Sequence, residues 1–308
     1  MATVQLEFEI VAEGLRFPEG PVAMADGSVL VVEVAAGIVT RIRPDGLKQT
    51  VAAPGGGPNG AAMGPDGKLY LCNNGGFSWL IQDGCHVPRA TAEDYDGGRI
   101  EVVDLATGRV ERLYDRVGGH RLRGPNDLVI DAGGGIWFSD HGKVRDRDRD
   151  NGGLYYARAD GSLIREAAYP VNSPNGVGLS PDGRTVYCAV TFERHLLAFD
   201  ITGEGEVREE PLFPGRVVAS TPGRQFLDSL AVTASGAVCV GCLMEEAGIV
   251  SLDPETGEAV NYTFPDLLPT NICFGGPDMR DAWITLSHSG KLLKTRWPEP
   301  GLKLAFNG

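Results

Sequence analysis

Short apolar runs separated by glycine-rich turns recur along the whole chain. Within many runs apolar and polar positions alternate as in a β-strand, and no long segment has the period of an amphipathic helix. Asp-Gly and other glycine-rich turns join successive runs, as in MADGSV and SPDGRTV, which predicts antiparallel hairpins. We therefore predict an all-β protein in which helix is scarce.

Six segments share one pattern: a Pro or polar residue, an Asn or acidic residue, a short apolar run, a turn and a further apolar strand. They begin at Phe17, Gly57, Gly124, Ser173, Phe226 and Pro269. A second pair of strands follows in most copies, as in LLAFDITG. Four short strands per unit, repeated six times, predict a six-bladed β-propeller, here as a single domain over residues 1–308. The run VQLEFEIVAEGL precedes the first repeat, and we expect it to supply the outer strand of the last blade.

One position of the repeat carries the candidate metal-binding and catalytic residues. The first strand of each blade lines the central channel of a propeller, so equivalent positions converge at the axis. Two carboxylates and four amides occupy this position, at intervals of 40 to 67 residues: Glu19, Asn59, Asn126, Asn175, Asp228 and Asn271. Two facing carboxylates repel each other, which raises one pKa unless a cation lies between them.

Carboxylate and amide oxygens are hard ligands, and no His or Cys stands at these positions. This set favours Ca²⁺, Mg²⁺ or Mn²⁺ over a tetrahedral zinc site, and it leaves coordination positions for water and substrate. The competing interpretation is that each Asn or Asp caps its own turn. A turn residue has no need to become Glu in one copy and Asp in another, which favours the metal site. For Asn59 and Asn271 both interpretations stay open.

Composition and charge limit the kinds of partner that the protein can bind. Glycine provides 43 of the 308 residues and stands beside Asp, Asn and Pro, as in tight turns. A net charge of −13 argues against nucleic acid and against an anionic membrane. The N-terminus resembles no secretory signal and no apolar run is long enough to span a bilayer, so we expect a cytoplasmic protein. Its six cysteines are then expected to be free thiols, with Cys239 and Cys242 buried on opposite faces of one strand.

The motifs FPEGP, GPNDLVID, SPNGVGLSPDG and LDSLAV, followed by FGGPD, resemble those of the senescence marker protein, gluconolactonase and luciferin-regenerating enzyme family over nearly the whole chain. The resemblance implies a six-bladed propeller that hydrolyses a lactone. It also implies one axial divalent metal, with Ca²⁺ expected first and Zn²⁺, Mn²⁺, Mg²⁺ or Fe²⁺ as alternatives. By motif position the metal ligands are Glu19, Asn126, Asn175 and Asp228, and Asp228 is in addition the catalytic general base.

The sequence departs from the family pattern in ways that concern the substrate. Gly124 stands where some sugar lactonases carry Arg, and Ser229 replaces the usual Gly after the last ligand. An insertion over residues 75–98 is apolar, with Phe77 and Trp79 among its residues. These departures predict a lactone less polar than a sugar lactone.

We predict four residues as substrate contacts: Asn59, Asn73, Arg123 and His141. Two other functions stay open, a phosphotriester hydrolase that uses the same metal site and a propeller that binds a ligand without catalysis. We expect a monomer or a small homo-oligomer.

Overall fold

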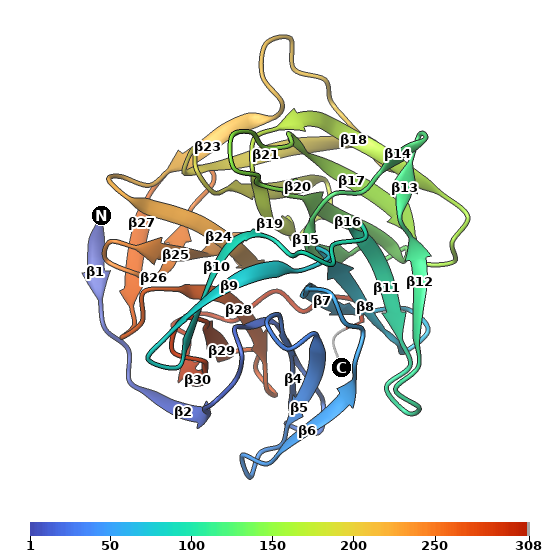
Figure 1. Cartoon of the computed structure of the whole chain (residues 1–308). Helices are drawn as coiled ribbons and strands as arrows, with labels where there is room; N and C mark the ends of the chain where they lie inside the picture. Colours follow the sequence, from blue (N-terminus) through green and yellow to red (C-terminus); the bar gives the residue numbers. More distant parts are fainter. Residues whose placement is uncertain (307–308) are drawn as a thin grey trace.

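A computed structural model of the chain describes residues 1–306. This part of the chain contains thirty β-strands and no helix, and Figure 1 shows its six main sheets arranged around a central axis as the blades of a propeller. The predicted fold class is confirmed. The last two residues of the domain predicted over 1–308 lie outside the described residues. Within residues 1–306 no helix is long and apolar enough to cross a membrane.

Each blade is an antiparallel sheet of four main strands, which follow one another from the axis outward. The innermost strands are β3 (Pro18–Ala23), β7 (Pro58–Met63), β15 (Pro125–Ile130), β19 (Pro174–Leu179), β24 (Gln225–Val232) and β28 (Pro269–Gly275). The second strands are β4 (Val29–Glu33), β8 (Leu69–Asn73), β16 (Gly135–Asp140), β20 (Thr185–Val190), β25 (Val238–Met244) and β29 (Asp281–Leu286). The third strands are β5 (Ile38–Ile42), β11 (Arg99–Val103), β17 (Gly152–Arg158), β21 (His195–Gly203), β26 (Gly248–Leu252) and β30 (Lys291–Arg296). The outermost strands are β6 (Lys48–Ala52), β12 (Val110–Tyr114), β18 (Ile164–Val171), β23 (Arg216–Ser220), β27 (Ala259–Thr263) and β2 (Phe8–Ala12).

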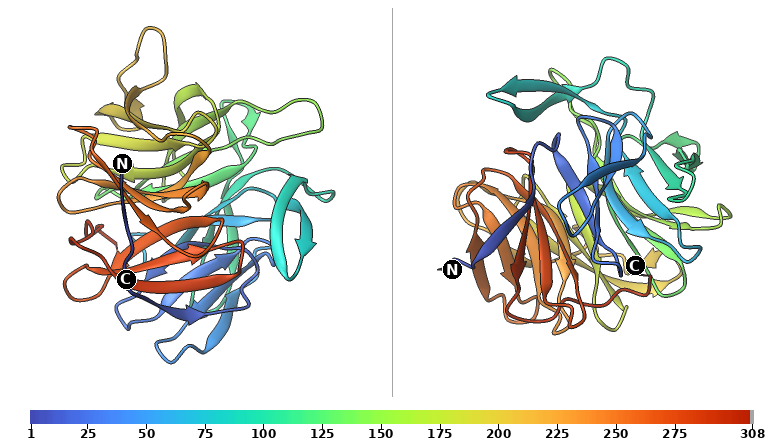
Figure 2. Two further views of the ribbon diagram at one scale, coloured as in Figure 1. Left: turned by 90° about the vertical axis from the view of Figure 1, so that its left-hand side faces the viewer. Right: turned by 90° about the horizontal axis from the view of Figure 1, so that it is seen from below.

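The N-terminus closes the ring of blades. β2 pairs with β30 and provides the outermost strand of the sixth blade, as predicted from the sequence. β1 (Ala2–Val4) runs parallel to β27 on the fifth blade. In Figure 2 the dark blue N-terminal strands lie against the orange and red blades. The first and last repeats of the chain are therefore held together by strand pairing.

Three short pieces stand outside the four-strand pattern. β22 (Glu206–Val207) pairs with β21, and β13 (Arg116–Val117) forms a ribbon with β14 (His120–Arg121). Within the insertion, β9 (Phe77–Gln82) and β10 (Cys85–Thr91) form a hairpin. Figure 1 shows this hairpin lying across the front face of the propeller, and the right-hand view of Figure 2 shows it standing off the blades.

The apolar core is divided among the interfaces between neighbouring blades, because side chains alternate between the two faces of each sheet. Cys239 and Cys242 illustrate this division. Both are fully buried, and they lie in different apolar clusters on the two sides of β25. The predicted burial of this pair on opposite faces is confirmed, and all six cysteines are free thiols.

A β-bulge interrupts every innermost strand where it passes the axis. In the first blade the register with β4 shifts between Glu19 and Val22, and matching shifts occur in the second to fifth blades. In the sixth blade the shift lies just before the axial residue, between Pro269 and Asn271. A bulge bends its strand and redirects the side chains on it. The sequence position that carries the candidate ligands therefore lies at or directly beside the irregularity of each innermost strand.

Neighbouring innermost strands approach each other closely just beyond this position. A Cβ atom on Gly20 would lie 2.4 Å from the carbonyl oxygen of Asn59. A Cβ atom on Gly60 would lie 2.6 Å from the Cα atom of Asp127, in the next blade. Real Cβ atoms do not come this close to backbone atoms, so the glycine after the axial residue is required by blade packing.

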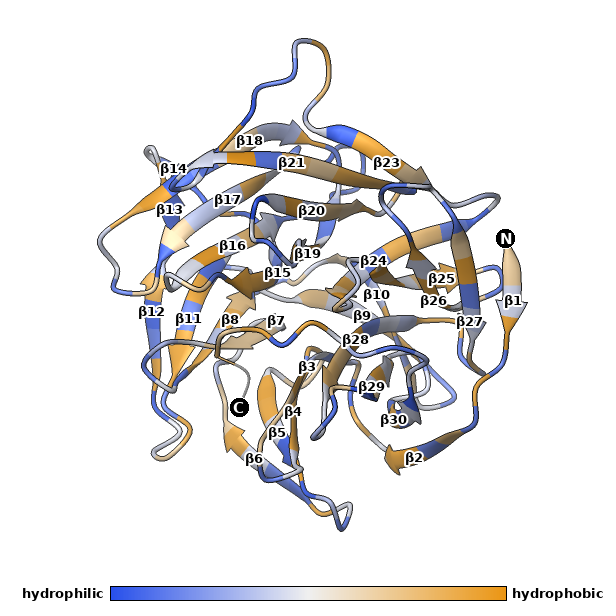
Figure 3. Cartoon of the chain, turned by 180° about the vertical axis from the view of Figure 1, so that it is seen from behind, coloured by the Kyte–Doolittle hydropathy of each residue, from blue (hydrophilic) through white to orange (hydrophobic). Residues whose placement is uncertain are grey.

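The far end of the innermost strands is apolar and covered by the C-terminal segment. A cavity of about 110 Å³ lies there, lined on one side by Leu302, Leu304 and Phe306. Figure 3 shows this segment crossing the back of the propeller at its centre. Polar axial residues therefore gather at the front end, which we define as the end where the innermost strands begin.

We expect Gly60→Ala to destabilise the protein by about 1 to 3 kcal/mol, because the added methyl group forces the second and third blades apart. Urea unfolding followed by far-ultraviolet circular dichroism measures the change. The matched control is Gly133→Ala, in an exposed turn where the nearest atom, Asp131 Oδ1, lies at 3.3 Å. Equal effects of the two substitutions would contradict the packing argument.

Candidate functional site

The six axial residues meet at the front end of the innermost strands. Asn271 Nδ2 donates a hydrogen bond of 3.1 Å to Glu19 Oε2, although the two residues come from opposite ends of the chain. Ser229 Oγ donates to Asn175 Oδ1 at 3.4 Å across the boundary between the fourth and fifth blades. Asn271 Oδ1 also accepts the N–H of Ile272 at 2.8 Å. Asn271 thus both caps its own backbone and positions Glu19.

The two axial carboxylates influence each other. Burial raises the pKa of Glu19, and its hydrogen bonds oppose this rise only in part. Burial, and after it the negative charge of Glu19, raise the pKa of Asp228 well above its ordinary range. The rise in pKa predicted for two facing carboxylates with no cation between them is therefore found at this pair.

A third carboxylate, Asp127, lies beside this pair, and sequence reasoning missed it. Its Oδ1 accepts the N–H of Leu128 at 2.9 Å and its Oδ2 accepts the N–H of Val177 at 3.3 Å, which ties β15 to β19. Burial and the charge of Glu19 raise its pKa to about 7. The available signal is that GPNDL has Asp where the matching motifs FPEGP, GPNGA and SPNGV have Gly.

The residues at the axis fit a divalent cation. Asn126 Oδ1 is buried and has no hydrogen-bond partner among the described residues. Asn175 Nδ2 donates to Thr191 Oγ1 at 3.2 Å, which fixes the orientation of the Asn175 amide. An unpaired buried oxygen beside two buried carboxylates is costly without a positive charge, and such hard oxygens suit Ca²⁺, Mg²⁺ or Mn²⁺. Within residues 1–306 no cluster of three or more His, Cys, Asp or Glu side chains offers another metal site.

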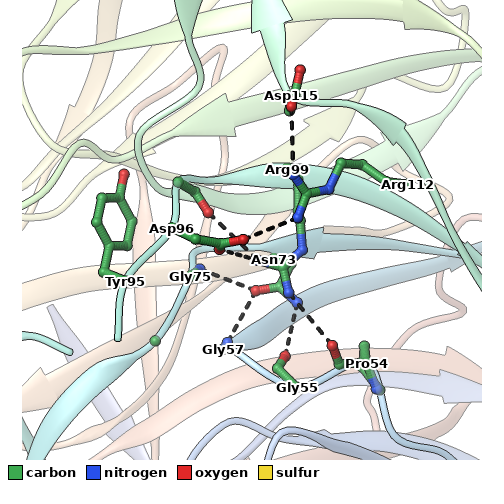
Figure 4. Close-up of polar contacts among 12 residues, drawn as sticks. Pro54, Gly55, Gly57, Asn73, Gly75, Tyr95, Asp96, Arg99, Arg112 and Asp115 are labelled. Atoms are coloured by element: carbon green, nitrogen blue, oxygen red, sulfur yellow. Dashed lines mark hydrogen bonds and ion pairs between the residues drawn. The ribbon is translucent and has the colours of Figure 1, made fainter. Parts of the chain in front are cut away.

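Asn73, predicted as a substrate contact, makes its hydrogen bonds within the protein, and contact with a substrate stays a prediction. Its side chain is fully buried, and Oδ1 accepts the N–H groups of Gly57 and Gly75, both at 3.0 Å. Nδ2 donates to the carbonyl of Gly55 at 2.9 Å and to Glu101 Oε2 at 2.7 Å (Figure 4). Asn73 therefore fixes the loop before β7 and the start of the insertion. A polar residue after an apolar strand can serve either role, and the sequence does not distinguish them.

Asn59 and Arg123 lie at the front end. Asn59 is a buried residue of the axial ring. Arg123 stands three residues before Asn126, and its backbone is fixed on both sides. Its N–H donates to Asp140 Oδ2 at 2.7 Å, and its carbonyl accepts the Tyr95 hydroxyl at 2.7 Å. The Arg123 side chain is exposed. Substrate contact by these two residues stays a prediction.

His141 follows β16 at the same end. Burial, and after it the charge of Arg149, lower the pKa of His141 to about 4, so the imidazole is neutral at neutral pH. Its Nδ1 is buried and unpaired among the residues the structure describes. A neutral imidazole with a free nitrogen can accept or donate one hydrogen bond. Its predicted contact with a substrate is chemically reasonable and stays a prediction.

Lys143 anchors the base of the hairpin, and sequence reasoning missed it as well. Its Nζ donates to the carbonyl of Gly76 at 2.7 Å and lies 4.4 Å from the centre of the Phe77 ring. Burial lowers the pKa of Lys143 to about 7, against the opposing charges of Asp140 and Asp150. No sequence signal marks this lysine, because its partners belong to a different blade.

A profile described as the SMP-30/Gluconolactonase/LRE-like region matches residues 17–288. The chain belongs to this family. The matched region includes all six axial residues and the hairpin, so the predicted family resemblance is confirmed.

Curated relatives within this family are distant. A gluconolactonase from Zymomonas mobilis is 27% identical over 206 residues, which cover 60% of this chain and 51% of that protein. Regucalcin from Xenopus laevis is 24% identical over 311 residues, which cover 98% of this chain and 93% of regucalcin. The chain thus spans about half the length of the gluconolactonase, and the activity of that relative enters here only as a proposal.

Solved structures of family members share the fold. A gluconolactonase from Xanthomonas campestris has a TM-score of 0.75 at 22% identity, covering 95% of this chain and 90% of that one. A calcium-binding protein, regucalcin, from Agrobacterium tumefaciens has a TM-score of 0.74 at 17% identity, covering 99% and 100%. At these identities the likeness establishes the six-bladed fold.

We expect the metal-free protein to lose stability as pH rises from about 5 through 7. The raised pKa values of Glu19, Asp127 and Asp228 mean that the folded protein retains protons that the unfolded chain has released in this range. Proton binding by the folded state stabilises it below the folded pKa, and that stabilisation disappears above it. Each unit of pKa difference corresponds to about 1.4 kcal/mol, so the total change should be a few kcal/mol.

Urea unfolding of chelator-treated protein at several pH values measures this slope. Asp228→Asn removes one of the interacting carboxylates and should flatten the slope. A stability that rises between pH 5 and pH 7 in the wild-type protein, or a slope unchanged by Asp228→Asn, would show that the axial carboxylates are not coupled as described.

Proposed function

We propose that this protein is a metal-dependent hydrolase that opens a lactone ring at the front end of the propeller. The observation that carries the proposal is the buried carboxylate pair Glu19 and Asp228 beside the unpaired oxygen of Asn126. Membership of a family whose relatives include gluconolactonases supports the same reaction. We propose that Glu19, Asn126, Asn175 and Asp228 hold one divalent cation, and their hard oxygens make Ca²⁺ the first candidate.

Asp228 is proposed as the general base. It keeps part of its surface exposed, and burial, followed by the charge of Glu19, raises its pKa, which makes the ionised carboxylate a stronger proton acceptor. A bound cation would favour this ionised form. A water molecule loses a proton to this carboxylate and attacks the carbonyl carbon of the lactone. The ring C–O bond then breaks, and the proton passes to the leaving ring oxygen to give a hydroxy acid. When bound, the cation would polarise the carbonyl group and stabilise the negative charge that develops on its oxygen.

The surrounding residues orient the base and the substrate. Asn175 hydrogen-bonds to Asp228 and lowers the pKa of its carboxyl, which partly offsets the effect of Glu19. Asn59, Arg123 and the neutral imidazole of His141 are proposed to bind the substrate. The six free cysteines support the proposed cytoplasmic location, where thiols stay reduced.

We expect Asp228→Asn to lower kcat for lactone hydrolysis about 10²- to 10⁴-fold, because a positioned base contributes this much to rate. The asparagine keeps an oxygen at the same place, so folding and much of the metal affinity should remain. Hydroxy acid formation measured with a pH indicator gives kcat, and calorimetric titration with Ca²⁺ gives the affinity. Asp45→Asn, in an exposed turn of the first blade, is the control with the same chemical change.

Near wild-type hydrolysis by the Asp228→Asn protein would exclude Asp228 as the base. Removal of metal with a chelator should abolish turnover, and added Ca²⁺ should restore it. Turnover that persists after complete removal of metal would exclude the proposed cofactor role.

A further inference from the structure

The loops that follow the second strands surround the axial ring from the front. In each blade the second strand ends beside the start of the innermost strand. Asn73 at the end of β8 pairs with Pro58, and Val190 at the end of β20 pairs with Pro174. The hairpin after Asn73 and the loop after Val190 therefore emerge at the end of the ring where the candidate ligands lie.

The first of two aromatic groups at this end joins the hairpin to the first blade. Trp79 of β9 lies 5.1 Å from Phe17 between ring centres, and Phe77 and His86 pack edge-on against the same indole. Phe17 stands two residues before Glu19 in the chain. Its backbone has φ of +56°, a conformation that is strained for a residue with a side chain, so tertiary packing must hold it there.

The hairpin is oriented by contacts at its base and along one face. A two-stranded hairpin is only marginally stable alone, and here Lys143 binds its base while Trp79 packs on Phe17. Leu80 and Ile81 next to Trp79 are 42% and 63% exposed. Trp79 is thus a large residue within β9 that packs on the body of the protein, whereas Leu80 and Ile81 are exposed.

A second aromatic group lies on the third to fifth blades. Phe226 stands two residues before Asp228, and its ring lies 5.9 Å from Phe192. Phe192 in turn lies 6.1 Å from His141 and is 47% exposed, with the Arg149 guanidinium 5.0 Å from its ring. Each of the two axial carboxylates is therefore preceded by a phenylalanine that packs against a further aromatic residue at the front end.

Apart from Asn59, Arg123 and His141, few polar side chains at this end are placed to bind a sugar. The positions that match Phe17 and Phe226 in the other four repeats are Gly57, Gly124, Ser173 and Pro269. Gly124 offers no side chain, and the hydrogen-bonding capacity of Asn73 is taken up within the protein. A polyhydroxylated lactone would leave hydroxyl groups against aromatic rings without partners, which is unfavourable.

Resting on the proposed lactone hydrolysis, we propose that Phe17, Trp79, Phe192 and Phe226 form an aromatic entrance that selects lactones carrying an aromatic substituent. Aromatic rings pack against one another in edge-on or offset geometry, as the residues of both groups already do. A flat apolar substituent would bind between the hairpin and Phe192 while the lactone carbonyl faces the axial residues. Trp79 is the residue through which the hairpin contributes to specificity.

Three six-membered lactones test this selection. They are δ-valerolactone, the same ring with a phenyl group beside the ring oxygen, and D-glucono-δ-lactone. We expect kcat/KM to be highest for the phenyl lactone and at least tenfold above that for δ-valerolactone. This ratio should fall at least fivefold in Trp79→Ala and be largely kept in Trp79→Phe. Ile81→Ala, at an exposed position two residues further along the same strand, is the matched control and should keep the wild-type ratio.

Fluorescence provides a binding measurement that does not depend on turnover. Of the four tryptophans, Trp137, Trp283 and Trp297 are only 1%, 5% and 2% exposed, whereas Trp79 is half-buried at the front end. In the Asp228→Asn protein, the phenyl lactone should quench tryptophan emission with saturation. The quenching should disappear when Trp79→Phe is added, and D-glucono-δ-lactone should cause none.

The two proposals fail in different ways. If no lactone is hydrolysed but the phenyl lactone still quenches Trp79, the proposed function is wrong and the aromatic entrance stands. If lactones are hydrolysed but the phenyl group brings no advantage, or if Trp79→Ala leaves the ratio unchanged, the aromatic entrance is wrong and the proposed function stands. Absence of saturable quenching by the phenyl lactone also overturns the entrance.

Discussion

The close approach of six innermost strands at one axis is the constraint on which the rest of this structure depends. It requires a residue without a side chain at Gly20 and Gly60, because the backbone of the next blade occupies the space of a Cβ atom. In the first blade the register shifts directly after Glu19, so the bulge begins beside this residue. Packing and chemistry thus share one short motif, and in the first, second and fourth blades its sequence form is an acidic or amide residue followed by glycine.

The same close approach of the innermost strands brings carboxylates together near the axis, where their negative charges must be offset. Glu19, Asp127 and Asp228 come from the first, third and fifth blades, yet burial raises the pKa of each, and the charge of Glu19 raises those of Asp127 and Asp228 further. Protons or a cation must offset this charge, since buried carboxylates without compensation are costly. Hydrogen bonds from Asn271 and backbone N–H groups supply part of the compensation. The negative charge that these hydrogen bonds leave uncompensated makes the axis suited to a bound cation.

Periodicity explains which features could be predicted from the sequence. The blades, the closing strand β2 and the axial position of Glu19 all repeat or border a repeat, so one copy supports the next. The structural role of Asn73 could not be predicted, because it depends on backbone groups of a loop elsewhere in the blade. Lys143 and the contact between Trp79 and Phe17 escaped prediction for the same reason: single long-range contacts leave no periodic trace. The repeat pattern of the sequence therefore predicts the propeller scaffold better than it predicts the aromatic entrance.

The difference between the scaffold and the aromatic entrance also affects how the substrate specificity of such a protein can change. The residues at the axis are tied to one another through β3, β15, β19 and β24, so a substitution there disturbs packing, charge and chemistry together. The β9–β10 hairpin meets the body mainly through Lys143 at its base and Trp79 on its inner face. It can therefore vary in length and composition with little cost to the ring of blades. The axis proposed to carry the reaction and the hairpin proposed to select the substrate are therefore attached separately, because the second strand β8 ends beside the start of β7, where an insertion can reach the axial residues without entering a sheet.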